Sequence, residues 1–330
     1  MHPYKYIKTN EANTAMKAVT ESEKAVFLAG GTNLVDMVRR DVTHPDLLVH
    51  IKDLPYGQIT SDSGGLRLGA LVSNSDTADH PQVMKDYPIL SQAILSGATD
   101  QLRNMATNGG NLMQRTRCPY FMSPDFPCNK RNPGSGCSAR NGMNRIHSIF
   151  GTSDYCIASF PSDMCAALTA LDAQIQVRRP DGTARSIPIT EFHRLPGDTP
   201  HIDNTLEHGE LITFIDLPGE TKAYAPKSVY LKVRDRHSYA FALVSVAVGL
   251  VLEDNRIQKV GMAMGSVAPK PWRATEAETI LTGKTPSERL FKEAAAATMA
   301  SAQGFGGNTF KIELGKRTIV RALHMALNKA

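Results

Sequence analysis

Four cysteines lie in an irregular stretch rich in proline, glycine, asparagine and arginine, and they constrain the fold more than any other feature. We call them the loop cysteines: Cys118, Cys128, Cys137 and Cys156. Their spacing, C-x9-C-x8-C-x18-C, lacks the close C-x2-C pair with which structural zinc sites present two thiolates to one ion. A 4Fe-4S cluster takes one cysteine at each of four corners and tolerates varied spacing. Spacing alone therefore leaves a cluster, zinc and unliganded thiols open.

A disulfide framework suits this chain poorly, because it has five cysteines in 330 residues and its first residues contain no apolar signal sequence. The fifth cysteine, Cys165, follows Ser162 and Asp163 in a pattern that continues to Leu171. This pattern predicts a helix with the thiol on its apolar face. A free cysteine there behaves as a small buried hydrophobe.

Length and a hydrophobic content of 42% predict about two globular domains. No apolar run approaches the ~20 residues of a membrane helix, and the longest candidate is 240–252. No nucleic-acid motif accompanies the net charge of +5, which argues against a nucleic-acid partner.

Basic residues gather around the loop cysteines, where they would stabilise a net-negative cluster. They are Arg103, Arg115, Arg117, Lys130, Arg131, Arg140 and Arg145.

Hydrophobic periodicity predicts three successive units of mixed helix and strand. The first has helices at 12–19 and 34–40 and strands at 25–28 and 47–51. The second has strands at 66–71, 175–177 and 211–217 and helices at 89–97 and 162–172. The third, from about residue 226, has strands at 229–233, 244–252 and 257–264 and helices at 289–302 and 311–328.

Two Gly-Gly turns are candidates for binding a phosphate. Gly30-Gly31 follows a predicted strand and precedes a helix, where backbone N–H groups and the side chains of Thr32 and Asn33 are available. The second turn, Gly109-Gly110, would let two backbones converge on one diphosphate. Neither the dinucleotide fingerprint nor a P-loop is present. The Ser162-Asp163 pair is either an ordinary helix cap or a contact to a ribose or ribityl hydroxyl.

These motifs together resemble the FAD-binding subunits of the xanthine dehydrogenase family of molybdenum hydroxylases. The resemblance rests on the segments 29–34, 66–71, 103–111 and 161–163. The sequence around the loop cysteines further resembles the 4Fe-4S insertion of periplasmic aldehyde oxidoreductase FAD subunits. The implied fold class is α+β, with a two-part FAD-binding domain of the vanillyl-alcohol-oxidase (PCMH) type followed by a smaller α+β domain of the CO dehydrogenase flavoprotein C-terminal type. The expected boundaries are 1–222, with subdomains of about 1–57 and 58–222 and the cluster loop at about 113–158, and then 223–330.

The resemblance also implies a set of FAD contacts. Asp163 would hydrogen-bond the cofactor, Ile212 would pack on the isoalloxazine and Lys232 would lie near the flavin ring, where a cation stabilises the reduced form. The loop cysteines would ligate the cluster. The residues expected around the diphosphate are Phe27, Leu28, Ala29, Gly30, Gly31, Thr32, Asn33, Leu34, Thr107, Gly109, Gly110 and Asn111.

The implied activity is electron transfer within a larger enzyme. A large molybdopterin subunit would oxidise an aldehyde, a small subunit with 2Fe-2S clusters would reduce this FAD, and an external acceptor would take the electrons. The segment 236–241 lacks the acidic residues of NAD-reducing relatives, which argues against NAD and leaves Tyr239 as a lid near the flavin. The compartment is either the periplasm, by export with a signal-bearing partner, or the cytoplasm.

Two other readings remain. A stand-alone flavin oxidase of the vanillyl-alcohol type would need a general base in this chain, and His193, His201 and His208 are expected to be solvated. A scaffold or sensor would use the flavin and the cluster without turnover.

Overall fold

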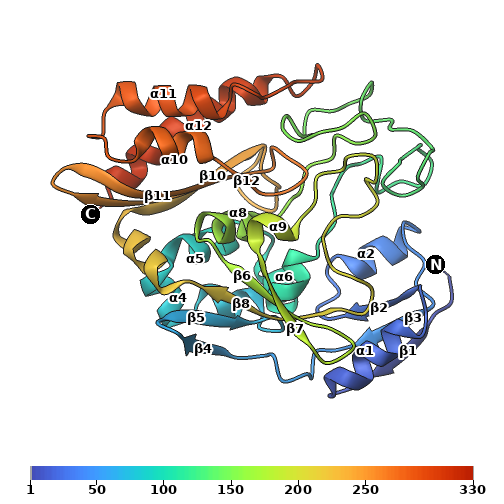
Figure 1. Cartoon of the computed structure of the whole chain (residues 1–330). Helices are drawn as coiled ribbons and strands as arrows, with labels where there is room; N and C mark the ends of the chain where they lie inside the picture. Colours follow the sequence, from blue (N-terminus) through green and yellow to red (C-terminus); the bar gives the residue numbers. More distant parts are fainter. Residues whose placement is uncertain (1, 330) are drawn as a thin grey trace.

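The computed structural model describes residues 2–329, which form three sheets flanked by helices (Figure 1). The first sheet is parallel, with strand order β1-β3-β2. Helix α1 packs on it through Ala15, Met16 and Val19, which are buried as the 3.6-residue period requires. Its elements are β1 (Lys5–Lys8), α1 (Ala12–Thr20), β2 (Ala25–Leu28), α2 (Leu34–Arg39) and β3 (Leu47–His50).

The second sheet is antiparallel, with order β4-β5-β8-β6-β7. Strand β8, late in the sequence, lies between β5 and β6, so that chain segments before and after the loop cysteines share one sheet. The strands are β4 (Ile59–Asp62), β5 (Gly65–Gly69), β6 (Gln174–Arg178), β7 (Ala184–Pro188) and β8 (Leu211–Leu217). The helices are α3 (Asn74–Ala78), α4 (Pro81–Asp86), α5 (Pro88–Leu95), α6 (Asp100–Met105), α7 (Asn108–Leu112), α8 (Asp163–Ala170) and α9 (Ile189–Phe192).

Between α7 and α8 the chain leaves this sheet and forms the cysteine loop, which we define as residues 113–162. It contains no helix and no strand. In Figure 1 it lies at the upper right, beside the C-terminal helices and above α2. It nevertheless has a small core of its own, because Phe121, Met122 and Ile157 pack with the loop cysteines against Met37 of α2.

The third sheet is antiparallel, with order β12-β11-β10-β9, and it has helices on both faces. Helices α10 and α12 contact one face and α5 and α8 the other (Figure 1). Double coverage explains why β10 is an almost continuous apolar run rather than an alternating one. The elements are the 3-10 helix η1 (Gly219–Lys227), β9 (Ser228–Val233), β10 (Val244–Glu253), β11 (Arg256–Gly265), β12 (Trp272–Arg273), α10 (Thr275–Leu281), α11 (Glu288–Thr298) and α12 (Phe310–Leu327).

Candidate functional site

The first Gly-Gly turn, Gly30-Gly31, packs directly against Met105, which lies just before the second turn, Gly109-Gly110. A Cβ atom on Gly30 would be 1.9 Å from the carbonyl oxygen of Met105, and Gly31 has a φ of +73°. Only glycine fits the first position without moving backbone, and glycine is strongly favoured at the second. The two turns therefore converge, as their sequences predict.

Asparagine side chains fix the second turn. Asn108 is buried and donates to the Gly69 carbonyl and to the Thr77 hydroxyl. Asn111 donates to Asn74 at 2.8 Å and accepts from the Ser162 hydroxyl at 2.7 Å. This network holds the start of α8 beside α7. Ser162 is also the N-cap of α8, since its hydroxyl accepts from the Cys165 N–H.

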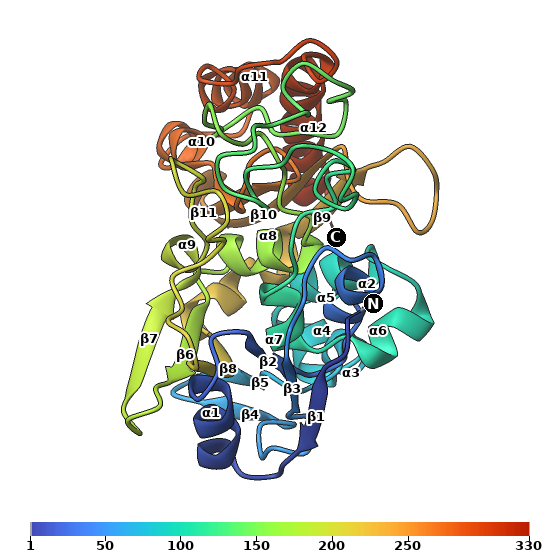
Figure 2. The ribbon, with the colours of Figure 1, turned by 90° about the vertical axis from the view of Figure 1, so that its right-hand side faces the viewer.

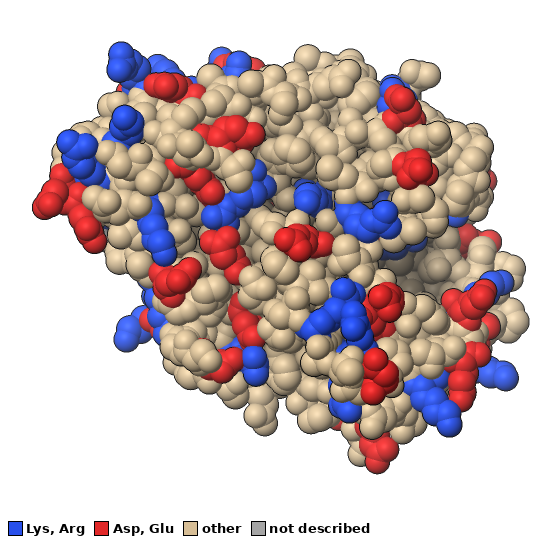
Figure 3. Space-filling model, in the orientation of Figure 1, with Lys and Arg blue, Asp and Glu red and all other residues tan. Residues whose placement is uncertain are grey.

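A cavity of about 710 Å³ lies between these turns, the cysteine loop and β9. This volume is typical of small-molecule and cofactor sites. Figure 3 shows the surface hollowed on the right-hand side, below the cysteine loop, with basic residues at the edge. The sequence-predicted residues that line the cavity are Thr32, Asn33, Gly110, Asn111, Asp163 and Lys232, together with Cys118. The others lie outside its lining: Phe27, Leu28, Ala29, Gly30, Gly31, Leu34, Thr107, Gly109 and Ile212.

Ile212 is not among the residues that line the cavity. It lies on β8, opposite Val177 of β6, and its side chain is 8% exposed within the main hydrophobic core. Its contact with the flavin ring stays a prediction.

Lys232 and Asp163 form a buried ion pair in the cavity wall. The Lys232 ammonium lies 2.7 Å from Asp163 Oδ2 and also donates to the Ser96 carbonyl. The other carboxylate oxygen accepts from the Tyr230 hydroxyl at 2.5 Å. Burial, with the neighbouring carboxylate, raises the pKa of Tyr230 well above its ordinary value. The expected cation is thus present, but a carboxylate already neutralises it.

The segment 234–242 joins β9 to β10 and supplies another part of the wall. Figure 2 shows this connection projecting from the side of the molecule. Tyr239 and Phe241 line the cavity yet are 56% and 50% exposed. Arg236 donates to the Tyr239 carbonyl, and Tyr239 has a φ of +48°. Tyr239 thus lies in the cavity wall, and its role as a lid stays a prediction.

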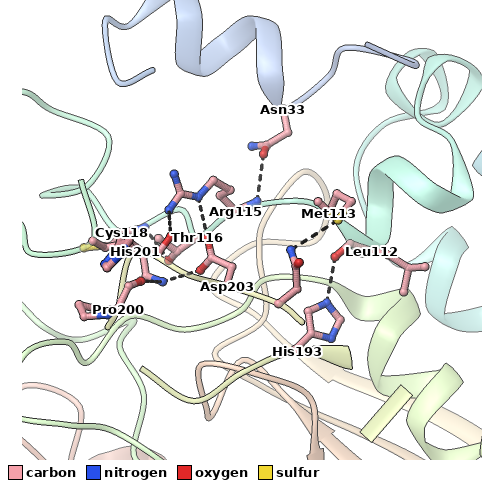
Figure 4. Close-up of polar contacts among 12 residues, drawn as sticks. Asn33, Leu112, Met113, Arg115, Thr116, Cys118, His193, Pro200, His201 and Asp203 are labelled. Atoms are coloured by element: carbon pink, nitrogen blue, oxygen red, sulfur yellow. Dashed lines mark hydrogen bonds and ion pairs between the residues drawn. The ribbon is translucent and has the colours of Figure 1, made fainter. Parts of the chain in front are cut away.

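Polar side chains in the cavity wall suit an anionic ligand. Asn33 accepts from the Arg115 backbone N–H through Oδ1 (Figure 4), and Arg117 pairs with Asp36. The Asn33 Nδ2 and Arg117 Nε atoms have no partner among the described residues, but protein atoms enclose both of them. The fit of the residues present to FAD therefore rests on the size of the cavity and on the close approach of the Gly-Gly turns beside Thr32 and Asn33.

The loop cysteines surround a second, small chamber. Cys128 and Cys137 face each other across a tight hairpin. Three of the four are buried, and Cys137 is partly exposed. In contrast, Cys165 is fully buried in the main core, as predicted, and burial raises the pKa of its thiol to about 12.

The sulfur atoms are too far apart for one zinc ion. Four thiolates around zinc lie about 3.8 Å from one another, as Zn–S bonds of about 2.3 Å require. Among the described residues only His2, Asp41 and His44, all exposed, have three ligand atoms within 4.8 Å of one another, so no three loop cysteines do. Corners of a 4Fe-4S cube are separate irons, so its thiolates stand farther apart. The set fits a cluster better than zinc.

Side chains that the sequence analysis did not single out hold the chamber together. Asn129 accepts from the Gly136 N–H and donates to the Tyr155 carbonyl, which links the hairpin to the segment of Cys156. Arg131 donates to the carbonyls of Tyr120 and Phe121. These side-chain hydrogen bonds to the backbone link the segments that carry the loop cysteines.

The basic residues around the loop are largely neutralised. Asp203 pairs with both Lys130 and Arg115, and Figure 4 shows its carboxylate pointing toward Arg115 of the cysteine loop. Burial raises the pKa of Asp203, but these two cations outweigh it and lower the pKa overall. Arg103, Arg117, Arg140 and Arg145 also have aspartate partners. These ion pairs weaken the positive field around the loop, and the stabilisation of a cluster by these basic residues stays a prediction.

The positions of two histidines, His193 and His147, could not be predicted from the sequence. His193 is 3% exposed and its Nε2 contacts the Leu112 carbonyl at 2.9 Å (Figure 4), so the prediction that it is solvated is wrong. The short helix α9 carries it into the core, where burial lowers its pKa to about 4. His201 and His208 are exposed, as predicted. His147, which the sequence analysis passed over, lies 3.1 Å from Cys118 Sγ.

Comparison with known proteins agrees with this geometry. Residues 2–220 match the family described as FAD binding domain in molybdopterin dehydrogenase, and residues 229–326 match the CO dehydrogenase flavoprotein C-terminal domain. The chain is 44% identical over 333 residues to the aldehyde oxidoreductase FAD-binding subunit PaoB of Escherichia coli (strain K12), with 100% of both chains covered. It is 28% identical to the glyceraldehyde dehydrogenase medium chain of Sulfolobus acidocaldarius, covering 89% of this chain and 87% of that one.

Solved structures share the fold. The chain superimposes on a chain of reconstituted CO dehydrogenase from Oligotropha carboxidovorans with a TM-score of 0.77, at 21% identity, covering 100% of this chain and 99% of that chain. A chain of quinoline 2-oxidoreductase from Pseudomonas putida 86 gives 0.74, at 21% identity, covering 98% and 97%. The α+β fold class predicted from the sequence is confirmed. Within residues 2–329, none of the helices combines the length and apolarity that crossing a membrane requires.

Proposed function

Because the chain belongs to the family of FAD-binding subunits of molybdopterin-dependent dehydrogenases, we propose that it is the electron-transfer subunit of a molybdenum-dependent aldehyde oxidoreductase. The aldehyde assignment rests on the full-length identity of 44% to an aldehyde oxidoreductase subunit. In this proposal a large molybdopterin subunit oxidises the aldehyde. A small subunit passes the electrons through 2Fe-2S clusters to the FAD of this chain, and an external acceptor receives them.

The observation that carries the proposal is the adjacency of two sites, the 710 Å³ cavity and the cysteine chamber, which share Cys118 as a lining residue. Bound FAD supplies a group that accepts electrons singly and releases them singly or in pairs. Thr32, Asn33 and Arg117 would hold its diphosphate, because these polar residues line the cavity beside the converging Gly-Gly turns.

The remaining lining residues would orient the ring system and limit its contact with water. Lys232 and Asp163 form a fixed dipole in the wall. Tyr239 and Phe241 would cover the open side as a lid. A general base for substrate is unnecessary here, because in this proposal the substrate chemistry takes place in the partner.

We assign one 4Fe-4S cluster to the loop cysteines. The experiment is to purify the complete complex and replace each loop cysteine by serine, with Cys165→Ala as the control. Each serine variant should lose the iron of one 4Fe-4S cluster and the visible absorption that this cluster contributes, whereas Cys165→Ala should keep both, because its thiol is buried away from the chamber. A wild-type complex in which the 2Fe-2S clusters of the small subunit account for all the iron, with zinc bound to this chain, would overturn the assignment.

NAD is expected to be a poor acceptor, because the lid segment contains Arg236 and His237 in place of acidic residues. The complete complex should oxidise aldehydes with a dye, a quinone or ferredoxin as the acceptor. Efficient formation of NADH by the complex would contradict this part of the proposal.

A further inference from the structure

Cys118 and His147 together form a wall between the two sites. Both residues line the large cavity, and Cys118 also lines the cysteine chamber. The His147 Nε2 atom lies 3.1 Å from Cys118 Sγ, which is within hydrogen-bond distance for sulfur. His147 is 1% exposed, so water does not compete for this contact.

The chemistry of the sulfur fixes the direction of the hydrogen bond. A cysteine that ligates iron is a thiolate and carries no hydrogen. The hydrogen of the contact must then lie on Nε2, so the imidazole is the donor. The other ring nitrogen, Nδ1, is buried and makes no side-chain hydrogen bond among the residues described. The sulfur is thus the side chain to which this ring hydrogen-bonds.

The backbone of His147 is held from the C-terminal domain. Its carbonyl accepts from the Lys311 ammonium at 3.0 Å and from Asn308 at 3.3 Å. Lys311 is 0% exposed and also donates to the carbonyls of Ile146 and Ser266. Burying an ammonium among carbonyls is costly unless all its donors are used, and here three acceptors surround it. The imidazole is therefore held firmly in place.

We propose that His147 is a positioning residue for the cluster, and that its hydrogen bond to Cys118 raises the cluster's reduction potential. The inference rests on the proposed function, because it requires the loop cysteines to ligate a cluster. Reduction adds one negative charge to the cluster, and a hydrogen bond to a ligating sulfur stabilises that charge. Because the same pair faces the large cavity, the potential is adjusted at the point where the cluster lies nearest the flavin cavity.

The test is a redox titration of the purified complex, in which EPR follows the reduced cluster and absorbance follows the flavin. His147→Leu removes the donor, and His147→Gln keeps an N–H. The ratio of reduced to oxidised cluster at a fixed potential should fall about tenfold in the leucine variant, a shift of about 59 mV for a one-electron couple. The glutamine variant should lie between the leucine variant and the wild type.

His193→Gln is the matched control. His193 is equally buried, and its Nε2 contacts a carbonyl rather than a sulfur. It lines neither the cavity nor the chamber. This variant should leave the cluster potential unchanged.

A second measurement needs no variant. In wild type with 15N-labelled histidine, pulsed EPR of the reduced cluster should detect coupling to one imidazole nitrogen. Absence of this coupling, or an unchanged potential in an iron-loaded leucine variant, overturns the inference and leaves the proposed function standing. A wild-type complex without the EPR signal of a 4Fe-4S cluster, whose iron is all accounted for by the partner's 2Fe-2S clusters, overturns the cluster assignment of the proposed function itself.

Discussion

The Lys232–Asp163 pair predicts that two substitutions shift the flavin potential in opposite directions. In the wild type the ammonium and the carboxylate lie 2.7 Å apart, so their charges nearly cancel at the cavity. Lys232→Met leaves a buried negative charge, which opposes reduction of the flavin. Asp163→Asn leaves a positive charge, which favours reduction. The double variant restores neutrality and should return close to the wild type.

The magnitude follows from Coulomb's law. With an effective dielectric constant of about 20 and a ring about 8 Å away, one unmatched charge changes the energy by about 2 kcal/mol. For a two-electron couple this corresponds to about 40 mV, negative for Lys232→Met and positive for Asp163→Asn. Removing one member of a buried ion pair also destabilises the fold by about 3 kcal/mol, because the other charge is left buried and unpaired.

The assay is a spectroscopic titration of the flavin in the complete complex, accompanied by thermal unfolding to register the loss of the pair. Aldehyde oxidation with a dye that takes electrons before the flavin should persist in both single variants. Shifts of the same sign in the two variants, or none in either, would show that the pair does not act on the flavin through its charge.

Three further predictions concern FAD binding and stability. Acid precipitation should release the flavin into the supernatant, because the Gly-Gly turn carries no His or Cys to link it; flavin in the pellet would refute noncovalent binding. Gly30→Ala should lower the flavin content, since the new Cβ would lie 1.9 Å from the Met105 carbonyl oxygen, and full flavin occupancy would contradict the turn geometry. Burial raises the pKa of Glu210, but hydrogen bonds from Arg185 and Arg179 outweigh it, so the folded pKa is below the usual value. Its stabilising effect is present above the unfolded pKa of about 4.3 and is lost as pH falls through the folded value, so urea titrations should find Glu210→Gln about 2 kcal/mol less stable at pH 7 and the difference smaller below pH 4.

Periodic elements could be predicted from the sequence. The strand at 25–28 and the strand at 211–217 agree with β2 and β8 residue by residue, and the helix at 12–19 agrees with α1 to within one residue. These segments have a regular apolar pattern that packing then preserves. The short helices α3, α6 and α7 were not predicted, because α3 and α7 bury polar residues such as Asn108 rather than an apolar stripe, and α6 buries no residue.

The candidate site likewise contains residues that the sequence could predict and residues that it could not. Thr32, Asn33 and Asp163 could be found because glycine turns and helix caps are local signals. The bond from Lys232 to Asp163 joins residues 69 positions apart and has no local signal. Ile212 could not be placed from a strand pattern alone, because alternation does not state which face meets a cavity. His147 had one signal, an imidazole among the loop cysteines, and its bond to Cys118 needed the folded loop.

Lys311 and Asn308 hydrogen-bond the backbone of residues 146–148, and this affects when the cysteine loop can take up iron during translation. The loop cysteines leave the ribosome well before residues 308–311, and domains generally fold as they emerge, from the N-terminus onward. Until α12 has been made and docked, the segment before Cys156 lacks its anchor. We therefore expect iron to enter only the completed chain, and nascent chains stalled before residue 308 to present thiols that chemical labels still reach.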